Sequence, residues 1–200
     1  FMVSLNWLAN IWAINNDQVV EASLGSYMVP LGNVVIGLLV FRERLSLWQF
    51  MAVILAAAGL VNLAVNFGSL PWISLAVAAT FTFYGFCKKI SHLSAVSGMV
   101  IDTSLIAPAA LIYLAGLNLS GLSHSLDLSP TSFLLIGAGL WNIVPLLLYA
   151  FSVNNLSLTL SGLLQYVAPT IAFALGVFVY DEPFTGTHLV TFGFIWTALF

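Results

Sequence analysis

Two prolines lie inside long apolar runs, where they could expose polar backbone groups to a ligand. Pro30 interrupts the run 22–41, and Pro169 lies in a second such run. Because proline has no N–H to donate to the carbonyl four residues earlier, we expect the carbonyls of Ser26 and Gln165 to be free. Such carbonyls are tolerated at membrane depth only where a neighbouring helix, a side chain or water satisfies them. The pair therefore predicts either two kinks around a central substrate cavity or two packing kinks without a ligand.

Two tyrosines accompany the prolines. Tyr27 and Tyr166 each precede a proline by three residues, a spacing that places them on the same helix face as the kink. A tyrosine offers an apolar ring and one hydroxyl group, which suits a partly aromatic substrate. The alternative is a buried tyrosine whose hydroxyl bonds a backbone carbonyl. We expect both tyrosines in or beside the wall of the cavity.

Amide side chains supply most of the other polar groups inside the apolar runs. Asn33 follows the first proline by three residues and Gln165 precedes the second by four, so we expect these two amides to line the cavity. Asn6 and Asn142 are further candidates for the substrate pathway. Amides in membrane helices also serve simply as hydrogen bonds to a neighbouring helix, worth about 0.6 kcal/mol each.

One acid, Asp102, lies well inside an apolar run. A carboxylate at the centre of a membrane helix costs about 3 kcal/mol on the insertion scale, so it should face the bundle or water. It could bind a transported proton or a cationic group. The alternatives are that it reaches the membrane interface and is solvated, or that it pairs with Lys88 or Lys89.

Other kinds of site have little support in the sequence. The three histidines are scattered and Cys87 is the single cysteine, so we expect no metal site, no disulfide and no cofactor. No glycine-rich phosphate loop, nucleophile elbow or zinc-protease motif occurs, so we expect no catalytic residues and no enzyme. Four basic residues argue against a nucleic-acid partner.

The composition places these residues in a membrane. The chain has 200 residues, of which 61% are hydrophobic and 6% charged. Soluble domains carry roughly 25% charged residues, so most of this surface must face lipid. We predict an all-α integral membrane protein whose partners are the lipid bilayer and a small-molecule substrate.

The apolar runs predict a bundle of about eight transmembrane helices, because a bilayer-crossing helix needs roughly 20 residues. Ser46 and Gln49 predict a capping box at the start of the third helix. The predicted spans are 1–15, 20–41, 47–66, 71–88, 96–116, 131–152, 157–180 and 187 to the last residue.

The two proline-containing runs belong to an internal repeat. A shift of 139 positions superposes Tyr27 on Tyr166, Pro30 on Pro169, Gly37 on Gly176 and Glu43 on Glu182. The helices within 71–116 have no counterpart in the chain, so we expect a fragment of a ten-helix parent with an inverted five-plus-five repeat. Residues 1–66 would be the last three helices of the first repeat, and 71–200 the second repeat with its last helix truncated.

The charged residues predict an orientation. All four basic residues fall in the second and fourth loops, which lie on one side of the membrane and should be cytoplasmic. The loop that holds Glu182 is then outside, as inversion of the repeat requires. Glu43 and Glu182 occupy equivalent positions, and we expect each to cap or bond the first turn of the next helix.

Four stretches resemble the drug/metabolite transporter superfamily, in particular the RarD-like branch of the EamA-type transporters. They are EASLGSYMVPLGN (21–33), LLQYVAPT (163–170), DEPF (181–184) and FGFIWTAL (192–199). The resemblance covers essentially the whole chain. It implies a ten-helix carrier of the cell inner membrane, built from two EamA repeats with cytoplasmic termini.

The function expected from these observations is secondary transport of a small organic metabolite or drug. We expect export by alternating access of two inverted halves, with protons as the candidate coupling ion. The alternatives are an uncoupled facilitative pore, which needs a continuous polar lining, a membrane enzyme, and an inactive truncated remnant of a transporter. The sequence names neither the substrate nor the oligomeric state.

Overall fold

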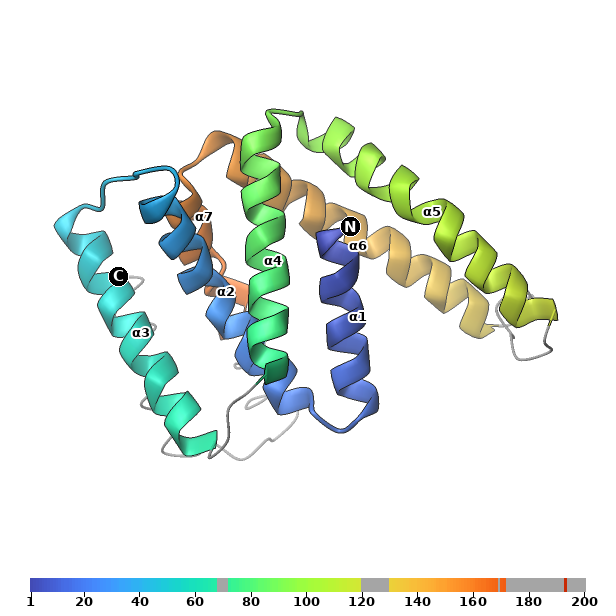
Figure 1. Cartoon of the computed structure of the whole chain (residues 1–200), viewed down its shortest axis with the longest axis horizontal. Helices are drawn as coiled ribbons and strands as arrows, with labels where there is room; N and C mark the ends of the chain where they lie inside the picture. Colours follow the sequence, from blue (N-terminus) through green and yellow to red (C-terminus); the bar gives the residue numbers. More distant parts are fainter. Residues whose placement is uncertain (68–71, 120–129, 169, 172–192, 194–200) are drawn as a thin grey trace. The chain divides into compact units, whose positions relative to one another are not determined.

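The computed structural model describes residues 1–67, 72–119, 130–168, 170–171 and 193, and within them the ordered elements are all helices (Figure 1). The helices are α1 (Met2–Asn15), α2 (Val19–Leu39), α3 (Leu47–Phe67), α4 (Trp72–Ser91), α5 (Ala95–Leu119), α6 (Pro130–Asn155) and α7 (Leu158–Leu164). The all-helical architecture predicted from the apolar runs is confirmed for these residues.

The bounds of the first six predicted helices agree with α1 to α6 to within a few residues, but those of the seventh do not. The prediction of a single helix over 157–180 is wrong, because α7 ends at Leu164 and a turn follows at residues 165–166. The backbone N–H groups of Gln165 and Tyr166 donate to carbonyls only three residues earlier, at 3.0 and 3.1 Å. This tightened turn precedes Pro169 in the sequence, and proline has no backbone N–H to donate. The rest of that span and the eighth span lie outside the described residues.

Side-chain caps begin several of the helices. The capping box predicted at α3 is confirmed: the Gln49 N–H donates to the Ser46 hydroxyl at 3.2 Å, and the Ser46 N–H donates to the Gln49 side chain at 3.0 Å. Ser157 accepts from the Leu160 N–H at the start of α7. These caps satisfy backbone donors that have no partner within their own helix.

Four of the described helices are long and apolar enough to cross a membrane, over Glu21–Leu39, Trp72–Ser91, Ala95–Leu117 and Ser132–Asn155. The surface of the described part carries many large apolar side chains; Trp141 on α6, for example, is 79% exposed. Such a surface suits lipid rather than water. The chain is a multi-pass membrane protein.

The helices form two compact units. One unit is Lys88–Asn155 with Phe1, and it contains the packed pair α5 and α6. The other contains α1, α2, α3, α7 and most of α4. In this second unit α1 to α4 run alternately in opposite directions, and α2 contacts α1, α3 and α7 (Figure 1). The proline-containing helix α2 is therefore the centre of its unit.

The contact between α2 and α7 depends on a glycine. A Cβ atom on Gly162 would lie 2.8 Å from the Pro30 carbonyl oxygen and 3.0 Å from the Asn33 Cβ. Only a residue without a side chain fits at this distance, as is common where membrane helices approach closely. The backbone of α7 at Gly162 therefore packs closely against Pro30 and Asn33 of α2.

Candidate functional site

A pocket of about 250 Å³ lies within the unit formed by α1, α2, α3, α4 and α7. Its walls come from α1, α2, α4 and the segment after α7, so it is a tertiary feature rather than a gap within one hairpin. The lining residues are Asn6, Ser26, Val29, Val77, Phe81, Gln165 and Ala168. Three of these side chains are polar and none is charged.

Asn6 forms the α1 side of the pocket and is 7% exposed. Its Nδ2 donates to the Val77 carbonyl at 2.8 Å and to the Thr80 hydroxyl at 3.1 Å. The amide therefore joins α1 to α4 while its oxygen accepts only a longer bond, 3.3 Å, from Asn10. Asn6 therefore both links α1 to α4 by hydrogen bonds and lines the pocket.

Gln165 lies in the turn that ends α7 and lines the pocket. Its Nε2 donates to the Ser161 carbonyl at 3.3 Å. The expectation of a free Gln165 carbonyl is wrong, because that oxygen accepts the Ala168 N–H at 3.3 Å. In the tightened turn the donor to the Gln165 carbonyl is Ala168, three residues later, instead of the fourth residue, Pro169, which has no N–H. The hydrogen bond that the proline cannot form is therefore replaced locally.

Ser26 and Pro30 belong to the α2 wall. Helix α2 continues through Pro30, which is buried and has no N–H to offer the Ser26 carbonyl. Ser26 lines the pocket, and its hydroxyl donates to the Ala22 carbonyl at 3.2 Å. Pro169, the expected partner of Pro30 across the cavity, lies outside the described residues.

The two tyrosines share an apolar cluster and do not line the pocket. Tyr166 is 1% exposed and packs with Ala52, Ala56 and Leu163, and Tyr27 packs against this cluster. Within the described residues the Tyr166 hydroxyl has no hydrogen-bond partner. The structure therefore brings the two tyrosines into one cluster of α2, α3 and the end of α7.

Asn33 is fully buried where α2 meets α7 at Gly162. Neither polar atom of its side chain has a hydrogen-bond partner among the residues that the structure describes. It is not among the residues that line the pocket.

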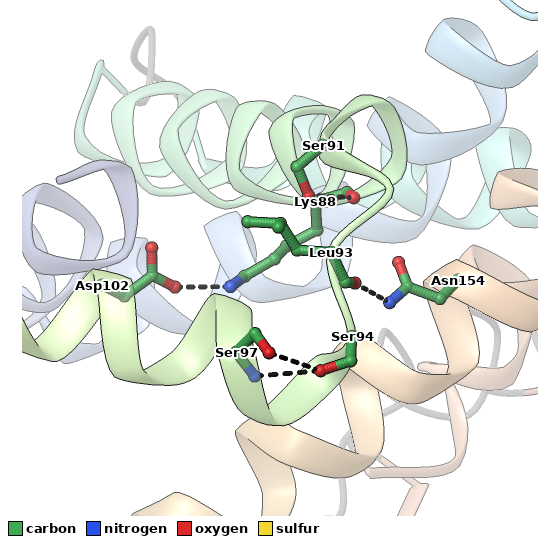
Figure 2. Close-up of polar contacts among 7 residues, drawn as sticks. All are labelled: Lys88, Ser91, Leu93, Ser94, Ser97, Asp102 and Asn154. Atoms are coloured by element: carbon green, nitrogen blue, oxygen red, sulfur yellow. Dashed lines mark hydrogen bonds and ion pairs between the residues drawn. The ribbon is translucent and has the colours of Figure 1, made fainter.

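The acid and the remaining amide of the predicted pathway lie in the other unit. Asp102 on α5 forms an ion pair of 2.7 Å with Lys88, which was one of the expected alternatives (Figure 2). A Cβ atom on Gly98 would lie 2.6 Å from the Lys88 Nζ, so the glycine leaves room for the lysine to reach across α5. Asn142 on α6 donates to the Ala138 carbonyl of its own helix at 2.9 Å. Neither Asp102 nor Asn142 lines the pocket between α1, α2 and α4.

Glu43 caps a helix other than the one expected from its place in the chain. Its carboxylate accepts the N–H of Leu158 at 2.7 Å and of Thr159 at 2.9 Å, at the start of α7. The prediction that Glu43 caps the next helix, α3, is therefore wrong, and Ser46 caps α3 instead. The Glu43 N–H also donates to the Gly37 carbonyl at 3.0 Å, which holds the loop against the end of α2. A carboxylate at a helix N-terminus satisfies free N–H groups and complements the helix dipole.

Sequence reasoning missed the apolar part of the pocket wall and part of its polar wall. Val29, Val77, Phe81 and Ala168 resemble lipid-facing side chains in a chain this apolar, and no local signal distinguishes them. The Ser26 hydroxyl was not predicted either, although its place four residues before Pro30 marked its carbonyl. Among the described residues, no group of three or more His, Cys, Asp or Glu side chains could hold a metal ion.

Comparison with known proteins agrees with the membrane architecture. The chain is 42% identical over 200 residues to the protein RarD of Escherichia coli, covering 99% of this chain and 67% of RarD. It is 40% identical over 206 residues to the uncharacterized transporter YojE of Bacillus subtilis, covering 99% of this chain and 66% of that protein. The uncharacterized transporter PA0485 of Pseudomonas aeruginosa is 37% identical over 199 residues, with 99% and 67% covered.

The chain spans about two thirds of the length of these relatives. No family model matches it. The identity extends over nearly the whole chain, including all the helices that form the pocket. With the apolar helices, this likeness shows that the chain is a membrane transporter and belongs to the RarD family.

Proposed function

We propose that the protein is a secondary transporter of the cell inner membrane that exports a small organic metabolite or drug. The pocket lined by Asn6, Ser26 and Gln165 is its substrate site. The observation that carries the proposal is this set of three polar residues, from α1, α2 and the turn after α7, gathered around one pocket whose other described lining residues are apolar. Sites for small molecules typically combine apolar walls with a few placed polar groups.

The position of the pocket suits alternating access. It lies beside the proline-containing part of α2 and beside Gln165, which precedes the repeat-related proline. In transporters with inverted repeats, substrates bind at the interface of the repeats and the halves rock around the site. The proposal extends to the five-plus-five repeat, with residues 1–66 in one half and 71–200 in the other.

We further propose that the coupling ion is a proton. Asp102 is 23% exposed and its partner Lys88 is 8% exposed, so the pair combines a nearly buried cation with an acid that water can reach. Protonation of the carboxylate would break this ion pair. An uncoupled pore, which needs a continuous polar lining, has less support, because four of the seven described residues that line the pocket are apolar.

Transport of a panel of radiolabelled metabolites and drugs into proteoliposomes tests the proposal. Asn6→Ala and Gln165→Ala should reduce transport of the solute that the wild type carries, because each removes a polar group from the pocket. The control is Asn16→Ala, which removes an exposed amide that donates to the Trp12 carbonyl of its own helix. Equal transport by all three variants would place the substrate elsewhere.

A further inference from the structure

A second pocket, of about 540 Å³, lies within the unit of residues 88–155. It is formed by the last turn of α4, the loop 92–94, the start of α5 and the last turn of α6. All of its described lining residues belong to this one unit. Two of them, Lys89 and His92, are basic, and none of them is acidic.

Hydrogen bonds within the unit hold the walls of this pocket together. The Lys89 Nζ donates to the Val153 carbonyl at 2.8 Å and so joins α4 to α6. The Asn154 Nδ2 donates to the Leu93 carbonyl at 2.7 Å, which joins α6 to the loop (Figure 2). His92 has a left-handed backbone, with φ of 51°, directly after the end of α4. The positions of the ammonium group and of the loop are therefore set before any ligand binds.

The polar groups of the pocket suit a phosphate. Lys89 supplies a positive charge, and the His92 imidazole carries at least one N–H in every protonation state. The Asn155 Nδ2 has two N–H groups, of which one donates to the Phe151 carbonyl at 2.8 Å. The helix ends contribute partial charges of about half a unit each, positive where α5 begins and negative where α4 and α6 end. With the full charge of Lys89 added, the balance of the described groups is positive.

The pocket lies where two membrane-crossing helices end. The apolar spans of α5 and α6 are Ala95–Leu117 and Ser132–Asn155, so one begins and the other ends at the pocket. The ends of such spans lie at the level of the lipid headgroups. Leu93 and Phe151, which line the pocket, are exposed apolar side chains. An acyl chain can cover this apolar surface, whereas a small soluble anion leaves it in contact with water.

We propose that this pocket binds the phosphodiester of an anionic phospholipid such as phosphatidylglycerol. Lys89 and His92 contact the phosphate, and the acyl chains lie on the exposed apolar surface of α5 and α6. The positive-inside rule predicts the cytoplasmic side for Lys89, where anionic lipids create a negative surface potential. Basic pockets between membrane helices on that side are typical sites for anionic headgroups. The proposal does not depend on the solute that the protein transports.

Native mass spectrometry of the purified protein in detergent tests the proposal. The protein is titrated with phosphatidylglycerol and with phosphatidylcholine of the same acyl chains, so that the two probes differ in headgroup charge. Phosphatidylglycerol should bind at least about fivefold more tightly, which is the contribution expected from one basic side chain near an anionic headgroup. Equal binding of the two lipids would overturn the proposal.

Variants of Lys89 show whether its charge causes the preference. Lys89→Gln keeps a donor for the Val153 carbonyl and removes the charge, so the affinity for phosphatidylglycerol should fall to that for phosphatidylcholine. Lys89→Arg keeps the charge and should retain the preference. Thermal unfolding without added lipid identifies any variant that is simply destabilised. A full preference in a folded Lys89→Gln variant would contradict the proposed contact.

A matched pair of asparagine variants tests the place of the site. Asn155 and Asn16 are both exposed amides whose Nδ2 donates at 2.8 Å to the carbonyl four residues earlier, and Asn155 alone of the two lines the pocket. Asn155→Asp puts a carboxylate beside the phosphate and should abolish the preference for phosphatidylglycerol, whereas Asn16→Asp should preserve it. Equal loss in both variants would show an effect of net charge and overturn the site.

Inorganic phosphate distinguishes a lipid site from a site for a soluble anion. Millimolar phosphate should leave bound phosphatidylglycerol in place, because the free anion lacks the acyl chains that cover the apolar surface. Displacement of the lipid by phosphate would show that the pocket takes a soluble anion and would overturn the lipid as its occupant. None of these measurements involves transport, so their failure leaves the proposed substrate site unaffected.

Discussion

The carboxylate of Glu43 accepts the backbone N–H of Leu158 at 2.7 Å, joining residues 115 positions apart in the chain. Its second oxygen accepts the N–H of Thr159 at 2.9 Å. The loop after α2 is thereby fixed to the first turn of α7, the short helix that leads to Gln165. An acid in a surface loop thus sets the position of one wall of the pocket without contacting the pocket itself.

Replacing Glu43 should loosen this attachment. Glu43→Ala removes two charge-assisted hydrogen bonds, each worth about 1.5 kcal/mol or more, and leaves two N–H groups without their acceptor. We expect a lower unfolding temperature and weaker substrate binding, with Glu43→Gln intermediate because it keeps one acceptor oxygen. Thermal unfolding in detergent and the apparent KM for transport measure the two effects.

The control for Glu43 is Asp17→Asn. Asp17 is an exposed acid whose backbone has a left-handed conformation, with φ of 58°, and asparagine tolerates that conformation. An equal loss of stability in Asp17→Asn would show that net charge, rather than the cap of α7, explains the Glu43 variants.

Gly162→Ala should separate α7 from α2. The added methyl group would lie 2.8 Å from the Pro30 carbonyl oxygen, so the helices must shift, at a cost of about 1–3 kcal/mol. We expect reduced stability together with a larger loss of transport, because the shift moves Gln165 relative to Ser26. Gly139→Ala on α6 is the matched control, since nothing lies within 4 Å of its Cβ position. Equal behaviour of the two variants would contradict close packing at Gly162.

Local signals explain why most of the helices could be predicted. Long apolar runs and the Ser46–Gln49 capping box are properties of neighbouring residues, and α1 to α6 follow them closely. The end of α7 was missed because a helix before a proline can either continue with a kink or tighten into a turn. The three-residue hydrogen bonds at Gln165 and Tyr166 result from tertiary context that a sequence does not display.

The sequence singled out two of the three polar residues that line the pocket, but neither Ser26 nor the geometry of the pocket. Asn6 and Gln165 stood out because amides are costly in apolar helices unless they are bonded. Val77 and Phe81 did not, because an apolar side chain at a pocket looks like one that faces lipid. The partner of Glu43 was missed because capping rules are local, whereas the N–H groups that it binds belong to α7.

Loss of one charge of the Lys88–Asp102 pair should lower the free energy of unfolding more than loss of both charges. Asp102→Asn removes the carboxylate that pairs with a lysine that is 8% exposed, a change that typically costs about 3 kcal/mol. The double variant Lys88→Met with Asp102→Leu removes both charges and should recover most of the lost stability. Thermal unfolding of the two variants and the wild type measures this, and an additive loss in the double variant would contradict the pairing.

The same acid tests the proposed proton coupling. In Asp102→Asn, uptake driven by a proton gradient should be abolished while counterflow exchange of substrate continues, because exchange moves no net protons. The two assays use the same proteoliposomes, so an effect on folding or expression reduces both signals together. Equal loss of both activities would assign Asp102 to structure rather than to coupling.

The orientation of the chain can be measured by cysteine labelling. In a background where Cys87 is replaced by Ser, single cysteines at positions 17, 44 and 182 are treated in intact cells with a membrane-impermeant maleimide. Position 44 lies in a basic loop and should be protected, whereas positions 17 and 182 should react. Reaction at 44 together with protection at 182 would refute the inverted repeat.

Pro30→Ala tests whether the missing hydrogen bond in α2 matters for transport. Alanine restores an N–H that can bond the Ser26 carbonyl, so α2 gains a hydrogen bond and straightens near the pocket. Stability should stay the same or rise, while transport falls by about tenfold or more. Transport falls because Ser26 and Val29 move relative to α1 and α4, and because the Ser26 carbonyl no longer offers an acceptor.

The matched control is Pro145→Ala, which restores a hydrogen bond within α6 at a proline whose side chain is exposed and does not line the pocket. Initial transport rates, divided by the amount of folded protein in the liposomes, separate the two variants. If Pro30→Ala transports as well as the wild type, the proline serves only the packing of α2 on α7, and the substrate site does not depend on the defect in its helix.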